Sequence, residues 1–405
     1  MTGIRVGNDE LSSHAERLLA RPVERGDLAL AFDESVASSA EVLVEGKSFY
    51  PPMLEDIASA KSSVHINQFG FRPGNVGDAF AEALVAKARE GVPVRLVVDR
   101  QGSDPERGSR KLYDELAAAG AQVCVVRATK PRAAVGPLGA GGALRWNLAG
   151  LAHIDHRKGV VVDGRIGWVG GAGIEDHFED GRFHDLFLRL SGPVVSQLQL
   201  VSLASFRWLG GSVDVAELEA LFPVADTGDA IPAVVLHNAP GRYRPITDAI
   251  ANILESAAES LDVVNPYVTD RGMIRRIAHA ARRGVRVRLF VPANANNWAC
   301  AAAQQFHHGM LLDAGVRILE YPTMLHAKAF VRDGEEVIAG TCNLEAWSLK
   351  RFFEMDVRLR SKAFAAQFDE RFTAPAEQVS TPGRRLTGVK ARAKAAAFAG
   401  LSPLL

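Results

Sequence analysis

Two stretches of the chain carry the same polar pattern: HRKGVVVDGRIGWVGG at residues 156–171 and HAKAFVRDGEEVIAGTCN at residues 326–343. Both read H-x-K-x4-D-x6-G. The fixed positions are His156, Lys158, Asp163 and Gly170 in the first copy, and His326, Lys328, Asp333 and Gly340 in the second. Four fixed positions rarely match by chance, and two matches in equivalent places of a repeat indicate an internal duplication.

The sequence around the pattern is also duplicated. Residues 86–98 (AKAREGVPVRLVV) and 279–291 (HAARRGVRVRLFV) each read as the end of an amphipathic helix, a capping glycine and an alternating strand. A strand is predicted before each copy, at 62–69 and 260–267, and a helix followed by a strand after each copy, ending with 116–126 and 312–321. Strands that alternate with helices predict an α/β fold. We expect two halves related by a pseudo-two-fold axis, each a mixed β-sheet flanked by helices.

The predicted organisation has four parts. These are an N-terminal extension (1–35), a first half (36–222), a second half (223–380) and a basic tail (381–405). The stretch 222–232 (FPVADTGDAIP) is typical of a linker, and the Gly/Ala-rich segment 131–150 is typical of a loop. Residues 378–405 contain five basic residues and no acidic one. This tail is either a frayed terminus or an interfacial helix that contacts anionic lipid.

The composition is that of a globular protein with a substantial core. The 405 residues include 47 Lys and Arg against 47 Asp and Glu, and 47% are hydrophobic. A net charge of zero disfavours a broad basic surface for nucleic acid. No secretory signal or membrane-spanning stretch is recognised, so we expect a cytoplasmic monomer that at most lies on the inner face of a membrane. Cys124, Cys300 and Cys342 form no CxxC pair, so neither a disulfide framework nor a cysteine zinc site is expected.

The residue types of the motif suit phosphodiester chemistry. In H-x-K, the imidazole and the ammonium lie on one face of a strand, because side chains alternate with period two. The two lysines, with Asn343, the Thr341 hydroxyl and the glycine turn at Gly171, are expected to bind phosphate oxygens. Asp163 and Asp333 each precede a glycine, so the sequence leaves open whether they serve the chemistry or only the turn.

Two carboxylates follow the motifs at matching distances. Asp185 lies 29 residues after His156, and Glu354 lies 28 residues after His326, each at the start of an alternating strand. We expect each carboxylate to accept a hydrogen bond from the histidine of its own half, which would fix the tautomer of the ring. The alternative is a pair of ordinary surface carboxylates.

The doubled H-x-K-x4-D pattern, the glycine turns and the downstream Asp185 and Glu354 resemble the phospholipase D superfamily. Within it, residues 40–375 are similar to bacterial cardiolipin synthases and related phosphatidyltransferases. The resemblance implies two α/β halves that share one central active site and a phosphohistidine intermediate. It also implies that His156 is the nucleophile and His326 the general acid and base. The implied substrates are a phospholipid and an alcohol or water.

Three positions depart from that family. Gly173 stands where most relatives have Asn, and Trp347 and Phe352 replace Arg and Asn. The change at Gly173 removes one phosphate-binding amide, so a catalytically weak protein that binds lipid or a partner is one alternative. A nuclease of the same superfamily is another.

No cofactor or metal is expected. A zinc site made by His153, His156 and His177 is disfavoured, because period two places His153 and His156 on opposite faces of a strand.

Overall fold

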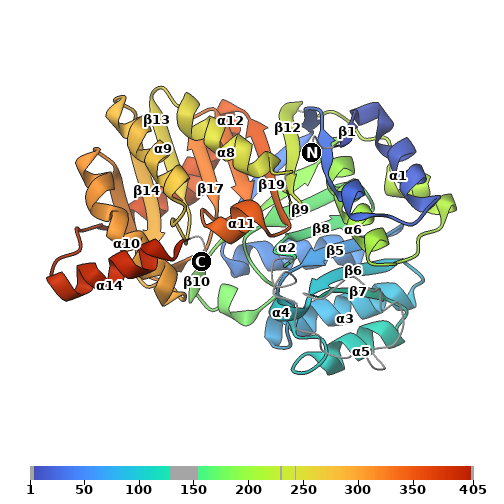
Figure 1. Ribbon diagram of the computed structural model, residues 1–405. Helices are drawn as coiled ribbons and strands as arrows, with labels where there is room; N and C mark the ends of the chain where they lie inside the picture. The colour runs from blue at the N-terminus through green and yellow to red at the C-terminus, as the bar shows by residue number, and fades with distance from the viewer. Residues whose placement is uncertain (1–3, 128–153, 229, 242, 403–405) are drawn as a thin grey trace.

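The computed structural model describes residues 4–127, 154–228, 230–241 and 243–402, which form two sheets, each covered by helices (Figure 1). Seven strands form the first sheet, in the order β4-β11-β9-β8-β5-β6-β7. Nine strands form the second, in the order β20-β15-β14-β13-β17-β18-β19-β12-β3. The predicted α/β fold with two mixed sheets is confirmed.

The first sheet contains three neighbouring parallel strands and four antiparallel ones. Its strands are β4 (Ser39–Val44), β5 (Val64–Gln68), β6 (Val94–Asp99), β7 (Gln122–Val126), β8 (Lys158–Val162), β9 (Ile166–Gly170) and β11 (Leu186–Ser191). The helices of this half are α2 (Gly46–Ser59), α3 (Asn75–Arg89), α4 (Arg100–Ser103), α5 (Arg110–Ala118), α6 (Val194–Trp208) and α7 (Leu218–Leu221).

The second sheet repeats the arrangement, with β13, β14 and β15 parallel and the remaining neighbours antiparallel. Its main strands are β12 (Ile231–Asn238), β13 (Ser260–Val264), β14 (Arg286–Pro292), β15 (Arg317–Tyr321), β17 (Ala329–Arg332), β18 (Glu336–Gly340) and β19 (Glu354–Arg360). Its helices are α8 (Pro245–Ser256), α9 (Arg271–Arg282), α10 (Trp298–Asp313), α11 (Ala346–Lys350), α12 (Lys362–Phe368) and α13 (Ala374–Val379). The strands predicted from the repeat therefore lie where the sequence indicates.

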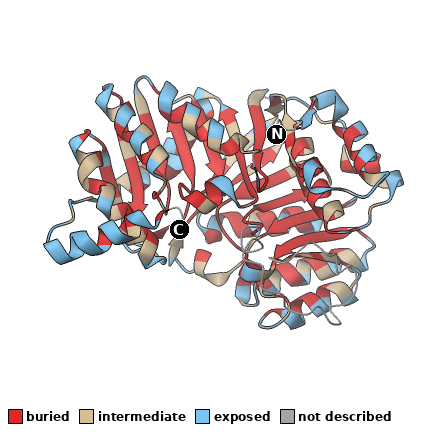
Figure 2. Cartoon of the chain, in the orientation of Figure 1, coloured by how far each residue is buried: buried red, intermediate tan, exposed pale blue. Residues whose placement is uncertain are grey.

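The core has three layers of apolar packing. One cluster joins the inner faces of the two sheets, and it includes side chains of α6 and α12. The other two lie on the outer faces, under α2, α3 and α5 in the first half and under α8, α9 and α10 in the second. Figure 2 shows the resulting pattern, with buried strands in the middle and exposed helix faces outside. The shared inner layer holds the two halves together as a unit.

Short edge strands of the second sheet lie at two of the predicted boundaries. Strand β3 (Ser35–Ala37) pairs with β12 of the second sheet, and β20 (Thr381–Pro382) pairs with β15. The boundary predicted at residue 36 therefore falls within β3, whereas β20 lies wholly within the predicted tail and adds an edge strand to the second sheet. The N-terminal extension forms β1 (Ile4–Val6), α1 (Leu11–Leu19) and β2 (Leu30–Phe32), and it packs on α6.

The remaining predictions on organisation have different outcomes. The predicted linker 222–232 begins directly after α7, but its last two residues belong to β12. The segment 131–150 lies outside the described residues. The tail forms helix α14 (Val389–Gly400), which packs on α10, so its described part is not a frayed terminus. Among the described residues, no helix combines the length and apolarity that crossing a bilayer requires.

The aspartates of the two motifs serve the turns. Asp163 and Asp333 both have positive φ angles, 53° and 51°. The Asp163 carboxylate accepts hydrogen bonds from the backbone N–H groups of residues 61–63 at 2.7–3.0 Å. The Asp333 carboxylate does the same for residues 258–260 at 2.7–3.2 Å. Each aspartate thus holds the turn after β8 or β17 against the segment that leads into the neighbouring strand. Of the two roles that the sequence left open, the structure supports the role in the turn.

We expect Asp163→Ala to destabilise the protein without removing its chemistry. The substitution leaves three N–H groups without their acceptor and puts alanine at a positive φ, which together cost about 2 kcal/mol of unfolding free energy. Asp163→Asn is the matched control, because asparagine tolerates this φ and keeps one acceptor oxygen. Urea denaturation and turnover per folded molecule test the prediction. A large loss of turnover in a fully folded Asp163→Asn variant would contradict it.

Candidate active site

Each motif histidine lies just before a central strand and is tied by its backbone to the other half. The His156 N–H donates to the Phe353 carbonyl at 2.9 Å, and the His326 N–H donates to the His184 carbonyl at 2.7 Å. The second contact continues the short parallel pairing of β10 (Phe183–His184) with β16 (Met324–Leu325). The residues that follow Phe353 and His184 are Glu354 and Asp185. The backbone pairing therefore brings each carboxylate next to the histidine of the opposite half.

The histidine–carboxylate pairs are crossed between the halves. Nδ1 of His156 lies 3.0 Å from Oε1 and 3.1 Å from Oε2 of Glu354, and Nδ1 of His326 lies 2.7 Å from Oδ2 of Asp185. The carboxylate partners are those the sequence named, but the prediction that each belongs to the same half as its histidine is wrong. With Nδ1–H donating to the carboxylate, Nε2 carries the lone pair in both rings.

The motif lysines are buried beside the histidines. Nζ of Lys158 donates to the His156 carbonyl at 2.6 Å, and Nζ of Lys328 lies 3.2 Å from Nε2 of His326. Burial, followed by the charge of Lys328, lowers the pKa of Lys158 to about 7, and burial lowers the pKa of Lys328 to about 8. Two ammonium groups in one desolvated space form a site that an anion would stabilise.

Both imidazoles are neutral at physiological pH. Burial, with the charges of Lys158 and Lys328, holds the pKa of His156 well below its usual value. Burial and the charge of Lys328 lower the pKa of His326 to about 3, against the effect of Asp185. The charges of both lysines lower the pKa of each histidine, so each histidine responds to a lysine of the opposite half. The two motifs form one site.

The pKa values of the two carboxylates are shifted in opposite directions. Burial raises the pKa of Glu354 to about 7, with Lys158 opposing the rise. Burial acts on Asp185 in the same direction, but the charge of Lys328 and the hydrogen bond from His326 hold its pKa below the ordinary value. The site therefore is not symmetric in its electrostatics, although it is nearly symmetric in its geometry.

Two predicted phosphate ligands have other roles. The Thr341 hydroxyl donates to Oε2 of Glu354 at 2.5 Å, and the Ser348 hydroxyl donates to the same carboxylate, so Thr341 orients Glu354. The Gly171 N–H donates to the Leu186 carbonyl at 3.1 Å, so this donor is already used in a backbone hydrogen bond. Both roles differ from the prediction because the fold brings hydrogen-bond partners next to these two groups. Oδ1 of Asn343, by contrast, is buried without a hydrogen-bond partner, and its role as a phosphate ligand stays a prediction.

The motif glycines allow close approach of the carboxylate strands. A Cβ atom at Gly171 would lie 2.3 Å from Oδ1 of Asp185, and one at Gly170 would lie 2.2 Å from the Leu186 carbonyl oxygen. In the second half, a Cβ atom at Gly340 would lie 2.4 Å from Oδ1 of Asp356. These contacts are shorter than any side chain tolerates, which explains the fixed glycines of the motif.

The space beside Gly173 is filled by an acidic side chain. A Cβ atom at Gly173 would lie 2.6 Å from Oε2 of Glu175. Burial raises the pKa of Glu175, whereas Arg72 and Lys158 oppose the rise. The first half thus places a carboxyl group near Lys158 where the second half has Asn343. The sequence predicted only the loss of an amide, because a pattern cannot show which neighbour occupies the vacated space.

Aromatic rings and a buried ion pair surround the histidines and were missed from the sequence. Phe69 lies 5.0 Å from the His156 ring, and Phe178 lies 5.5 Å from the His326 ring, between ring centroids. Arg157, the middle residue of the first motif, forms a buried ion pair with Asp155 at 2.5 Å. Phe352, one of the departures from the family, lies 6.1 Å from His156. These groups exclude water from both rings, which explains the low pKa values.

Within the described ranges, no three His, Cys, Asp or Glu side chains gather in a way that could hold a metal ion. His153, which the zinc interpretation requires, lies outside those ranges.

The chain matches the protein family described as "Cardiolipin synthase, PLD-like domain" over residues 53–180 and 250–375. The chain belongs to this family. The two matched segments lie within the two predicted halves, and each contains one motif. The resemblance to phospholipase D-like phosphatidyltransferases and the prediction of an enzyme of that type are confirmed.

Cardiolipin synthases are similar to most of the chain in sequence, and a solved structure shares its fold. The cardiolipin synthase of Geobacillus kaustophilus is 28% identical over 358 residues, which covers 85% of this chain and 68% of the relative. The major cardiolipin synthase of Bacillus subtilis is 27% identical over 327 residues, 79% of this chain and 65% of that protein. The phosphatidylserine synthase of Haemophilus influenzae has the same fold, with a TM-score of 0.70 at 12% identity over 97% of this chain and 100% of the other.

Proposed function

We propose that the protein transfers a phosphatidyl group from a phospholipid to an alcohol, as a cardiolipin synthase does, and releases phosphatidic acid when water is the acceptor. The observation that carries the proposal is the pair of neutral histidines, each with a carboxylate at Nδ1 and a lysine beside it. The family match supports the lipid class of substrate.

The first step of the proposed mechanism forms a covalent intermediate. Nε2 of His156 attacks phosphorus, the bond from phosphorus to the leaving alcohol oxygen breaks, and His326 gives its Nε2 proton to that oxygen. The His326 ring must be protonated for this step. A bound phosphodiester would raise the pKa of His326 by its negative charge, and Asp185 supports the imidazolium. Glu354 stabilises the charge that develops on the His156 ring.

The second step reverses the roles of acid and base. Neutral His326 takes the proton from the acceptor alcohol, the alkoxide oxygen attacks phosphorus, and the bond between phosphorus and Nε2 of His156 breaks. Two inversions give retention of configuration at phosphorus. Lys158, Lys328 and Asn343 bind the non-bridging oxygens throughout, so the charge compensation is supplied by the protein and turnover should persist in EDTA.

A product assay tests the proposal. Purified protein with labelled phosphatidylglycerol and a short alcohol, in EDTA, should form the phosphatidyl alcohol, and without the alcohol it should form cardiolipin or phosphatidic acid. An exposed histidine provides the control, because His279→Ala should leave the product ratio unchanged. A labelled oligonucleotide is tested in parallel. Cleavage of the oligonucleotide without turnover of lipid would identify a nuclease, and lipid binding without any cleavage would identify an inactive binding protein.

A further inference from the structure

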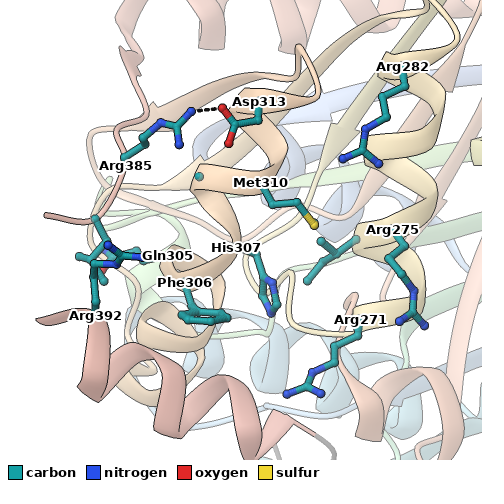
Figure 3. Close-up of a pocket in the computed structure, with 13 residues that line it drawn as sticks. Arg271, Arg275, Arg282, Gln305, Phe306, His307, Met310, Asp313, Arg385 and Arg392 are labelled. Atoms are coloured by element: carbon teal, nitrogen blue, oxygen red, sulfur yellow. Dashed lines mark hydrogen bonds and ion pairs between the residues drawn. The ribbon is translucent and has the colours of Figure 1, made fainter. Parts of the chain in front are cut away.

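A second cluster of cations lies outside the active site. Helices α9 and α10 and the start of the tail enclose a pocket of ≈ 790 Å³ (Figure 3). Five exposed arginines line it: Arg271, Arg275, Arg282, Arg385 and Arg392. The first three come from one face of α9, and the last two come from residues more than a hundred positions further along the chain.

Most of this positive charge has no ionic partner among the described residues. Arg385 forms an ion pair with Asp313, the one acidic residue of the pocket lining (Figure 3). Arg271, Arg275, Arg282 and Arg392 form no ion pair with any described residue. Nε2 of His307, which also lines the pocket, is buried without a hydrogen-bond partner. Like charges held together without counterions favour the binding of an anion, and guanidinium groups match phosphate oxygens in geometry.

Exposed apolar side chains lie on or next to the same helices that line the pocket. Four of the large hydrophobic residues exposed in the described chain lie on or next to α10 and α14: Trp298 (61% exposed), Phe306 (43%), Val389 (86%) and Leu401 (47%). Trp298 packs edge-on against Phe398, with a centroid distance of 4.8 Å, and the Lys394 ammonium lies 5.2 Å from its ring centroid. Such a combination of basic and aromatic residues is typical of a membrane interface.

We propose that the surface formed by α9, α10 and α14 docks the protein on an anionic bilayer, with a lipid phosphate bound in the arginine pocket. The aliphatic side chains Val389 and Leu401 favour a bilayer over a nucleic acid, because they offer burial in acyl chains and no platform for stacking bases. The inference rests on the proposed function and adds to it the surface by which the enzyme binds the bilayer that contains its substrate. Its main test measures vesicle binding, so it can fail or succeed independently of the catalytic proposal.

The main test compares binding of the full chain to sedimented vesicles. The triple variant Arg275→Gln/Arg282→Gln/Arg392→Gln removes cations without touching Arg271, which donates to the Ala399 carbonyl, or the Arg385 ion pair. Vesicles of phosphatidylcholine with about 30% phosphatidylglycerol should bind the wild type, and pure phosphatidylcholine should not. Each lost arginine should weaken binding about fivefold, so the triple variant should bind about 100-fold more weakly. Turnover of a soluble short-chain lipid should be unchanged.

Matched controls separate local from general charge effects. The variant Arg89→Gln/Arg107→Gln/Arg165→Gln removes the same charge from exposed positions of the first half and should bind vesicles like the wild type. Trp298→Ala should weaken vesicle binding while the response to salt is retained. Equal binding by both triple variants would overturn the proposal. So would tighter binding of a single-stranded oligonucleotide than of the vesicles, or equal binding to vesicles with and without phosphatidylglycerol.

Discussion

Replacing either motif histidine by alanine should lower kcat by about 10⁴-fold or more, because one histidine forms the covalent bond and the other moves both protons. The two variants should differ in what they accumulate. With a labelled phospholipid that carries a good leaving group, His326→Ala should still form a phosphohistidine, since such a leaving group needs no protonation. His156→Ala should form none.

Trapping at high pH followed by peptide mapping measures this difference. The control His279→Ala changes an exposed histidine of α9 and should leave both turnover and labelling intact. Label on the peptide that contains His326, and none on that of His156, would reverse the assigned roles and keep the covalent mechanism. No label on either, together with inverted configuration at phosphorus, would contradict a covalent mechanism.

Removing the carboxylates should reveal the crossed pairing. Glu354→Gln and Asp185→Asn should each lower kcat on the order of 10³-fold, because each removes the group that fixes the tautomer and supports the charge of one ring. Glu354→Gln should also abolish phosphohistidine formation, since Glu354 contacts His156. Asp185→Asn should retain it with a good leaving group, since Asp185 contacts His326.

The labelling pattern distinguishes these positioning residues from a merely structural role. Pairing within each half would give the opposite pattern, with label lost in Asp185→Asn and kept in Glu354→Gln. Glu345→Gln is the matched control, because Glu345 is buried in the same half and caps α11, and burial raises its pKa to about 8. Glutamine keeps one of the two oxygens that accept hydrogen bonds in this cap, and Glu345 forms no hydrogen bond to either histidine, so turnover should fall far less than in Glu354→Gln.

Much of the fold follows from local pattern. Helix and strand periodicity with capping glycines predicts the units that end in β6 and β14, and these strands lie where expected, at Val94–Asp99 and Arg286–Pro292. The duplication predicts one site from two motifs, because a histidine and a lysine in each copy supply the groups that phosphodiester transfer needs. Local sequence is sufficient here, since side-chain alternation and helix capping depend on near neighbours.

Other features depended on contacts that no local pattern encodes. The spacing from histidine to carboxylate is nearly the same in both halves, 29 and 28 residues, so sequence alone favours pairing within a half. The actual pairs are separated by 198 and 141 residues. Backbone hydrogen bonds between the halves, at Phe353 and His184, place each carboxylate beside the histidine of the opposite half. In the same way, the arginine pocket arises only because α14 packs on α10 beside α9. The sequence alone determined which groups the protein brings to a phosphodiester. The packing of the two halves against each other decided which carboxylate pairs with which histidine, because the energy of a hydrogen bond depends on the distance between its atoms in space and not on their separation along the chain.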